Sequence, residues 1–201
     1  GACPDAQTIT RTWTAMDDCG NLASSDQTIT VVDTSAPVIS ACAPDLSVQC
    51  FADVPDADPA SVVASDNCSP TLVVTVLATN ITGTGCAADP GLVEYVYQVA
   101  DRCGNTVSCT QTITVVDTTA PVLSIPADAV IECGGDTSTN ALGVAAATDN
   151  CSTNSTISFS DSAVAGACPQ EFTINRAWTA MDDCGNAVTN TQVISVVDTS
   201  A

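Results

Sequence analysis

The chain has 201 residues, including 12 cysteines and 3 arginines but no histidine or lysine, and a net charge of −20 at pH 7. This charge repels nucleic acid and anionic membrane surfaces, so we expect neither as a partner. Without His and Lys the usual general bases and nucleophile activators are missing, so we expect no catalytic residues and no enzyme. No apolar run is long enough for membrane insertion. The dense, even-numbered cysteines indicate an extracellular or cell-surface location.

The sequence repeats itself. Residues 1–36 return at 166–201, and a looser copy covers 85–120. The triplet Cys-Gly-Asn begins at Cys19, Cys103 and Cys184, at spacings of 84 and 81 residues. A fixed period of this size predicts a tandem array of one small domain. With cuts at the Ala-Pro junctions, the predicted domains are the C-terminal part of a repeat and two complete repeats, at 1–36, 37–120 and 121–201.

Apolar residues alternate with polar ones throughout each repeat. In residues 8–15 the inward positions are Ile9, Trp13 and Ala15, and the next strand contributes Ile29 and Val31. In the two complete repeats, earlier strands are expected at 46–50, 72–76, 129–133 and 155–159. The later inward positions are Val93, Tyr97, Val99, Ile113 and Val115, then Ile174, Trp178, Ala180, Ile194 and Val196. The pattern predicts an all-β fold of tandem antiparallel sandwiches with roughly seven strands each, and no helix.

The linkers are almost absent. Only five residues, Asp-Thr-Thr-Ala-Pro, separate Val116 from Val122, and proline fixes one backbone dihedral in the link. We therefore expect a semi-rigid rod.

The cysteines predict a framework of disulfide staples. Cys42 and Cys109 occur only in the second repeat and are replaced together, by Ile125 and Asn190, so we expect them to bond each other. If residues 1–36 are self-sufficient, the remaining bonds are local. They are then Cys3–Cys19, Cys50–Cys68, Cys86–Cys103, Cys133–Cys151 and Cys168–Cys184. A crossed alternative, Cys50–Cys86 with Cys68–Cys103, stays open because connectivity does not follow from sequence.

Three motifs carry a family resemblance. The segments Ala-Pro-Val-Ile-Ser-Ala-Cys42, Asp-Asn-Cys68 and Cys103-Gly-Asn-Thr-Val-Ser-Cys109 resemble hyalin-repeat (HYR) domains. They look most like the tandem versions in large surface or secreted proteins of Bacteroidota. The resemblance implies immunoglobulin-like sandwiches with an adhesive or spacing role outside the cell and no enzymatic activity. The third repeat departs from the pattern by lacking the outer cysteine pair.

Recurrent acidic residues suggest calcium as a cofactor. One aspartate precedes each Cys-Gly-Asn turn, one begins each Asp-Asn-Cys motif, and one lies at each domain junction. The candidate ligands are Asp17, Asp101 and Asp182, Asp66 and Asp149, and Asp33 and Asp117. Calcium takes six to eight oxygen ligands, which clustered Asp, Asn and carbonyl groups supply. Alternatively, these side chains only build turns.

Glycosylation is the second chemical signal. Asn-x-Ser/Thr motifs occur at Asn67, Asn80, Asn150 and Asn154. Asn67 and Asn150 adjoin cysteines and are poorer acceptors, whereas Asn80 and Asn154 are expected in polar loops. Thr118 and Ser162 lie in motifs that resemble the O-glycosylation signal of Bacteroidota. All six could equally be ordinary exposed residues.

Three functions follow from this pattern. The leading one is a structural or adhesive extracellular array that forms a stalk, surface fibre or filament. The alternatives are a glycan- or protein-binding module and an accessory domain array of a secreted enzyme. Residues 1–36 carry only the final strands of a domain, so their apolar face needs partner strands. We expect these from upstream residues of the same polypeptide or from a second molecule, by self-association into a fibre.

Overall fold

The computed structural model describes residues 3–199. The chain divides into two compact units. One comprises Gly1–Leu46, Pro55–Thr82 and Leu92–Thr114, and the other comprises Ser47–Val54, Gly83–Gly91 and Val115–Ala201. The unit borders run through the second repeat, so neither unit coincides with one repeat. No helix among the described residues is long and apolar enough to cross a membrane.

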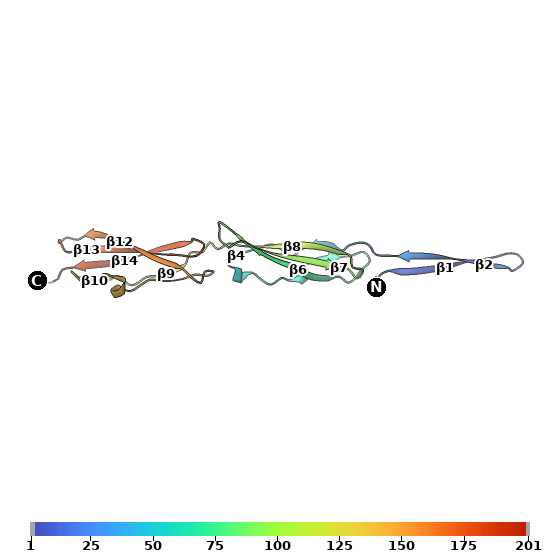
Figure 1. The fold of residues 1–201 in the computed structure, drawn as a ribbon, viewed down its shortest axis with the longest axis horizontal. Helices are drawn as coiled ribbons and strands as arrows, with labels where there is room; N and C mark the ends of the chain where they lie inside the picture. Colours follow the sequence, from blue (N-terminus) through green and yellow to red (C-terminus); the bar gives the residue numbers. More distant parts are fainter. Residues whose placement is uncertain (1–2, 200–201) are drawn as a thin grey trace. The chain divides into compact units, whose positions relative to one another are not determined.

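The third repeat folds as two sheets packed face to face (Figure 1), with its strands at the red end of the chain. A four-stranded sheet has the order β10-β14-β13-β12 and a two-stranded sheet pairs β11 with β9. The strands are β9 (Val122–Ser124), β10 (Ala129–Glu132), β11 (Ala146–Thr148), β12 (Thr156–Ala165), β13 (Phe172–Met181) and β14 (Ala187–Val197). Strand β10 runs parallel to β14, and the other pairs are antiparallel.

The second repeat uses the same arrangement. Its sheets have the orders β4-β8-β7-β6 and β3-β5. The strands are β3 (Val38–Ala41), β4 (Leu46–Val48), β5 (Val63–Ser65), β6 (Val73–Thr82), β7 (Gly91–Ala100) and β8 (Thr106–Val115). The immunoglobulin-like β-sandwich is therefore confirmed, with six strands among the described residues of each complete repeat rather than roughly seven. Contrary to the sequence prediction, short helical turns occur at η1 (Phe51–Asp53), η2 (Pro59–Ser61) and α1 (Thr139–Leu142).

The predicted inward positions of both complete repeats are buried. In the third repeat, Trp178 and Ala180 of β13 pack with Leu123 of β9 and Ala145. A buried glutamine anchors each core by accepting from an aromatic residue and donating to a loop carbonyl. Gln192 bonds the indole of Trp178 and the carbonyl of Ala127, at 3.2 and 2.8 Å. Gln111 bonds the hydroxyl of Tyr97 and the carbonyl of Pro44, at 2.9 and 2.6 Å.

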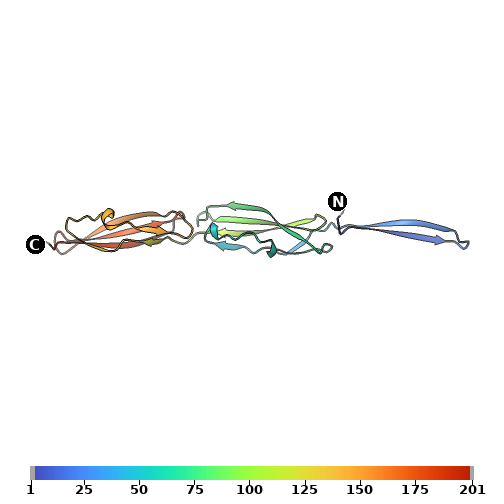
Figure 2. The same ribbon diagram turned by 90° about the horizontal axis from the view of Figure 1, so that it is seen from below.

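The first repeat segment is a bare hairpin. Strands β1 (Gln7–Met16) and β2 (Leu22–Val31) pair antiparallel along their full length. No other strand lies against them in either view (Figures 1 and 2). Trp13 is 60% exposed, whereas its counterpart Trp178 is 3% exposed. The inward face predicted for this segment therefore has no covering sheet among residues 3–199.

Candidate sites at the repeat junctions

Three disulfides join successive repeats, which the sequence did not predict. Of the six predicted bonds only Cys42–Cys109, within the second repeat, is confirmed. The other three disulfides in the structure, none of them predicted, are Cys3–Cys103, Cys50–Cys151 and Cys86–Cys184. Each links residues 98 to 101 positions apart. The predictions Cys3–Cys19, Cys50–Cys68, Cys86–Cys103, Cys133–Cys151 and Cys168–Cys184 are wrong, as is the crossed alternative. Cys19, Cys68, Cys133 and Cys168 are exposed free thiols, so the prediction that all twelve cysteines are bonded within this chain is also wrong.

Strand length explains why the local pairs fail. The ten-residue strand β1 separates Cys3 from Cys19. A strand of that length spans about 33 Å, whereas the Cα atoms of a disulfide lie within about 7 Å. The ten-residue strands β7 and β13 likewise separate Cys86 from Cys103 and Cys168 from Cys184. The same strand-length argument, applied to the sequence, could have excluded these three pairs.

The pair Cys133–Cys151 fails because the two residues lie at opposite ends of the third repeat. The backbone N–H of Cys133 donates to the carbonyl of Val197, at the end of the last strand, at 2.8 Å. Cys151 follows β11, whose last residue Thr148 pairs with Val122 at the start of the repeat. Cys50 and Cys68 occupy the corresponding positions of the second repeat.

A tight turn presents the cysteine of each Cys-Gly-Asn motif. The Oδ1 atom of Asp182 accepts from the backbone N–H groups of Cys184 and Asn186, both at 2.8 Å. Its Oδ2 atom accepts from the side-chain amide of Asn186 at 2.8 Å. Gly185 has φ +87°, a left-handed conformation that favours glycine. Both carboxylate oxygens are thus used within the turn, as the turn-building interpretation predicts.

The other two copies of this turn have the same hydrogen bonds. Asp101 accepts from Cys103 and twice from Asn105 at 2.7 to 2.8 Å. Asp17 accepts from Cys19 and twice from Asn21 at 2.8 to 2.9 Å. The side-chain amide of Asn21, followed by its backbone N–H, holds the pKa of Asp17 below its usual value. We infer that these acids orient the cysteine of the turn.

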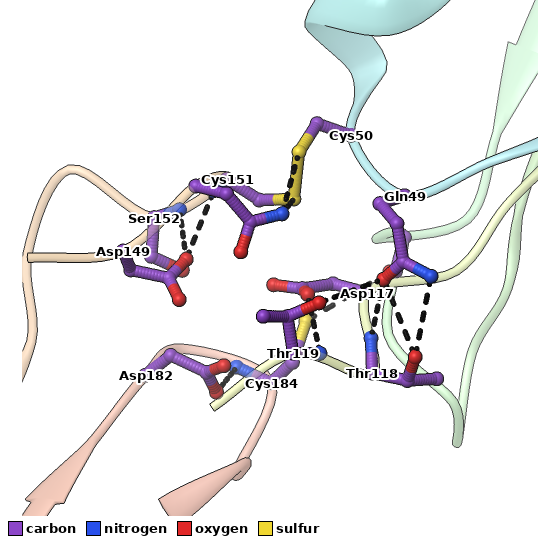
Figure 3. The surroundings of a disulfide bond; sticks show 12 residues. Gln49, Cys50, Asp117, Thr118, Thr119, Asp149, Cys151, Ser152, Asp182 and Cys184 are labelled. Atoms are coloured by element: carbon purple, nitrogen blue, oxygen red, sulfur yellow. Dashed lines mark hydrogen bonds between the residues drawn. A yellow bond between two sulfur atoms is a disulfide. The ribbon is translucent and has the colours of Figure 1, made fainter. Parts of the chain in front are cut away.

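Asp117 and Asp149 form a different arrangement beside the Cys50–Cys151 disulfide (Figure 3). The Oδ1 atom of Asp149 accepts from the backbone N–H groups of Cys151 and Ser152, at 2.9 and 2.7 Å. The Oδ1 atom of Asp117 accepts from Thr119 at 3.0 Å. The Oδ2 atoms of both acids are buried without a hydrogen-bond partner, and Asp117 is 2% exposed.

The same arrangement recurs where the hairpin meets the second repeat. A carboxylate oxygen from each of Asp33, Asp66 and Asp101 lies within 4.8 Å of the others. The Oδ2 atoms of Asp33 and Asp66 are again buried and unpartnered. The side-chain amide of Asn105 donates to the carbonyl of Asp33 at 3.4 Å, as that of Asn186 does to Asp117 at 3.3 Å.

These acid groups suit a hard cation. Two buried carboxylates with unpartnered oxygens repel each other unless a cation or proton lies between them. Calcium takes oxygen ligands, which Asp33 and Asp66, or Asp117 and Asp149, can supply. A thiolate metal site does not fit, because Cys151 beside the second group is bonded to Cys50. The grouping of Cys3 and Cys103 with Asp5 fails for the same reason, since these cysteines are bonded to each other.

The structure thus divides the seven candidate calcium ligands. It brings Asp33, Asp66 and Asp101 together in one group and Asp117 with Asp149 in another. Asp182 lies on the turn whose Asn186 bonds the Asp117 carbonyl. Asp17 lies on the hairpin turn and joins no such group among the described residues.

All six candidate glycosylation residues are exposed. Asn154 lies in a loop as expected, but Asn80 lies within strand β6, where it pairs with Glu94. The loop prediction for Asn80 is therefore wrong, because the strand continues beyond its apolar start to Thr82. Asn67 and Asn150 adjoin the acids of the two junction groups. The backbone N–H of Thr118 donates a hydrogen bond to the side-chain oxygen of Gln49, and Ser162 lies on the edge strand β12.

No protein-family model and no curated protein matches this chain. Solved structures of cadherin ectodomains align with it. The protocadherin gammaB4 extracellular domain is 15% identical at a TM-score of 0.34, covering 97% of this chain and 40% of that one. A protocadherin gammaB7 EC3-6 cis-dimer structure is 16% identical at a TM-score of 0.36, covering 96% of this chain and 60% of that one. Drosophila N-cadherin EC1-3 is 13% identical at a TM-score of 0.30, covering 95% of this chain and 89% of that one.

The chain spans less than two thirds of the length of both protocadherins. At these identities and TM-scores, nothing about their binding or assembly is transferred to this chain.

Proposed function

We propose that this chain is a structural or adhesive segment of an extracellular repeat protein, a stalk, surface fibre or filament. The observation that supports it best is the pair of disulfides, Cys50–Cys151 and Cys86–Cys184, between the second repeat and the third. Disulfides persist in oxidising, extracellular compartments. Two covalent bonds beside the peptide link oppose separation and bending of neighbouring domains, which a load-bearing array requires.

The proposal treats residues 1–36, 37–120 and 121–201 as successive repeats of one array. The resemblance to hyalin-repeat domains of Bacteroidota surface proteins is consistent with this role, as are the exposed sequons. The glycan-binding alternative would use an exposed aromatic platform. Trp13 is the exposed tryptophan, but its counterpart Trp178 is a core residue, so a missing covering sheet accounts for its exposure.

Calcium is the cofactor we propose for the junctions. The unpartnered Oδ2 atoms of Asp33 and Asp66, and of Asp117 and Asp149, would coordinate it, with carbonyls and water completing the shell. The ion would neutralise the repelling carboxylates where one repeat meets the next and thereby stiffen the junction.

The decisive experiment compares junction disulfides with an internal one. Non-reducing peptide mapping should recover Cys50–Cys151 and Cys86–Cys184. The quadruple variant Cys50→Ser, Cys151→Ser, Cys86→Ser, Cys184→Ser removes both disulfides between the second and third repeats. It should broaden the distribution of largest dimensions in small-angle scattering, because the two repeats are then joined by the peptide link alone. The matched control, Cys42→Ser with Cys109→Ser, removes a disulfide within one repeat and should leave that distribution unchanged. Local pairs such as Cys133–Cys151 in the map would contradict the proposal.

A further inference from the structure

The three disulfides between repeats follow one pairing rule. The bond always joins a forward cysteine of one repeat to a receiving cysteine of the next. Forward cysteines follow the second strand (Cys50) or precede the strand equivalent to β7 (Cys3, Cys86). Receiving cysteines belong to the Asp-Asn-Cys motif (Cys151) or the Cys-Gly-Asn turn (Cys103, Cys184).

The four free thiols occupy these same positions. Cys133 and Cys168 are the forward cysteines of the third repeat, the counterparts of Cys50 and Cys86. Cys68 and Cys19 are receiving cysteines of the second repeat and of the first segment. Under the pairing rule, none of the four has its partner among the cysteines of residues 3–199.

Around Cys168, the third repeat is already folded as its bonded counterparts Cys3 and Cys86 are. In each of the three copies, the carbonyl of the forward cysteine accepts from the backbone N–H three residues later. These bonds join Cys3 to Ala6, Cys86 to Asp89 and Cys168 to Glu171, at 3.0, 3.0 and 3.1 Å. The free and the bonded copies therefore share this local turn.

The two free forward cysteines also lie at one end of the repeat. The Sγ atom of Cys133 contacts the Oε1 atom of Gln170, two residues after Cys168, at 3.3 Å. The backbone N–H of Cys133 donates to the carbonyl of Val197, the last residue of β14. Both thiols are exposed, so an incoming domain can reach the two together.

We infer that Cys133 and Cys168 form a covalent docking site for one further repeat of this same sequence type. Cys133 bonds the Asp-Asn-Cys cysteine of the incoming repeat, and Cys168 bonds its Cys-Gly-Asn cysteine. In each bond two thiols lose two protons and two electrons. The electrons and protons pass to an acceptor disulfide such as oxidised glutathione, which becomes two thiols. The inference rests on the proposed role as a repeat array.

The test uses the full chain lengthened after Ala201 by a second copy of residues 121–201. In that copy, Ser152→Thr and Asp183→Glu mark the two receiving peptides by mass. After equilibration in a glutathione redox buffer, non-reducing peptide mapping should find Cys133 and Cys168 bonded to the marked Cys151 and Cys184 counterparts. Cys133→Ser should free only the marked Cys151 counterpart, and Cys168→Ser only the marked Cys184 counterpart.

Two outcomes would overturn the inference. One is a bond between Cys133 and Cys168, and the other is recovery of both as free thiols while the marked peptides stay unbonded. The same map contains the Cys50–Cys151 and Cys86–Cys184 peptides as an internal reference. Their loss would count against the proposed function itself, whereas their presence beside an unbonded third junction rejects the docking site alone.

Discussion

At the scale of single residues, the number of hydrogen-bond donors around an aspartate determines what it can do. The turn acids Asp17, Asp101 and Asp182 each accept three hydrogen bonds from their own motif, which use both oxygens. Asp33 and Asp117 each keep one buried oxygen without a donor. The second kind therefore has the greater coordination capacity left for a cation.

Calcium should raise the melting temperature of the chain relative to chelator, because a ligand that binds only the native state stabilises it. The gain is about 2.7 kcal/mol at 100 times the dissociation constant. The double variant Asp33→Asn, Asp117→Asn should lose this response and melt higher than the parent in chelator, since carboxylate repulsion is relieved. Asp18→Asn with Asp56→Asn, at exposed positions away from both acid groups, is the charge-matched control and should keep the response. Identical melting of the parent chain in both buffers would favour turn-building alone.

The Arg176–Asp161 pair gives the third repeat a dependence on acid. Arg176 is buried and donates two hydrogen bonds to Asp161, at 2.8 and 2.9 Å. These bonds hold the pKa of Asp161 below its ordinary value. The folded pKa is the lower one, so the stabilisation is complete above the unfolded pKa of about 3.9 and is lost as pH falls through the folded pKa.

Replacing Asp161 with Asn should destabilise the third repeat at pH 7 by about 1 to 3 kcal/mol. The change leaves the buried guanidinium of Arg176 without its counter-charge. Solvent screening at the partly exposed Asp161 makes this loss smaller than for a fully buried pair. Denaturant titrations at pH 7, 5 and 3 should show a smaller loss between pH 5 and 3 than in the parent. Asp183→Asn, in the same repeat, should retain the parent profile. A variant whose acid sensitivity matches the parent would contradict the assignment.

At the scale of elements, the hairpin β1–β2 and its counterpart β13–β14 have nearly the same sequence in different surroundings. Trp178 packs against Phe159, with ring centroids 5.0 Å apart, and lies in the core, whereas Trp13 faces outward. The two tryptophans therefore form an internal comparison between a covered and an uncovered sheet.

Replacing Trp178 with Ala should lower the free energy of unfolding by about 3 to 5 kcal/mol, the usual cost of truncating a buried aromatic residue. Replacing Trp13 with Ala should change it by less than about 0.5 kcal/mol, as at other exposed positions. The midpoints of urea unfolding, followed by far-UV circular dichroism, measure both. A comparable loss for Trp13→Ala would mean that strands from a second molecule cover the hairpin in solution.

The long strands could be predicted from sequence because their own alternation specifies them. The apolar positions predicted to face inward on β7, β8, β13 and β14 are buried. The prediction misses Tyr95, Gln111, Arg176 and Gln192, which are buried on the same strands. The strands β3, β5, β9 and β11 have three or four residues each, too few to show a period, and depend on their pairing partners. The approach of Asp117 to Asp149, 32 positions apart in the chain, depends likewise on tertiary packing.

The disulfide pairings escaped prediction for a different reason. The alternation of strands places residues on a face, but it does not say which ends of neighbouring domains meet. Cys42 and Cys109 could be paired because they disappear together from the third repeat. The cysteines retained in both complete repeats offer no such contrast, so their bonding between repeats is visible only in three dimensions.

At the scale of the whole molecule, the disulfides change the length of chain that carries tension. A pull between Cys3 and Cys184 need not follow the 181 peptide bonds between them, because it crosses to Cys103, returns along the chain to Cys86 and crosses again. Only the 18 residues from Cys86 to Cys103, joined by 17 peptide bonds, bear the load. Fully stretched, they reach about 60 Å, compared with roughly 280 Å for the 81 residues of a repeat period.

Single-molecule pulling should therefore find a contour length of no more than about 60 Å between the Cys3–Cys103 and Cys86–Cys184 disulfides, even after the second repeat has unfolded. In the quadruple serine variant of Cys50, Cys86, Cys151 and Cys184, the contour should approach about 280 Å. Long release steps from the intact chain would contradict the bonding pattern. A fibre built in this way can lose the fold of a repeat without becoming slack, so its resistance to stretching is set by covalent bonds and not by the stability of its domains.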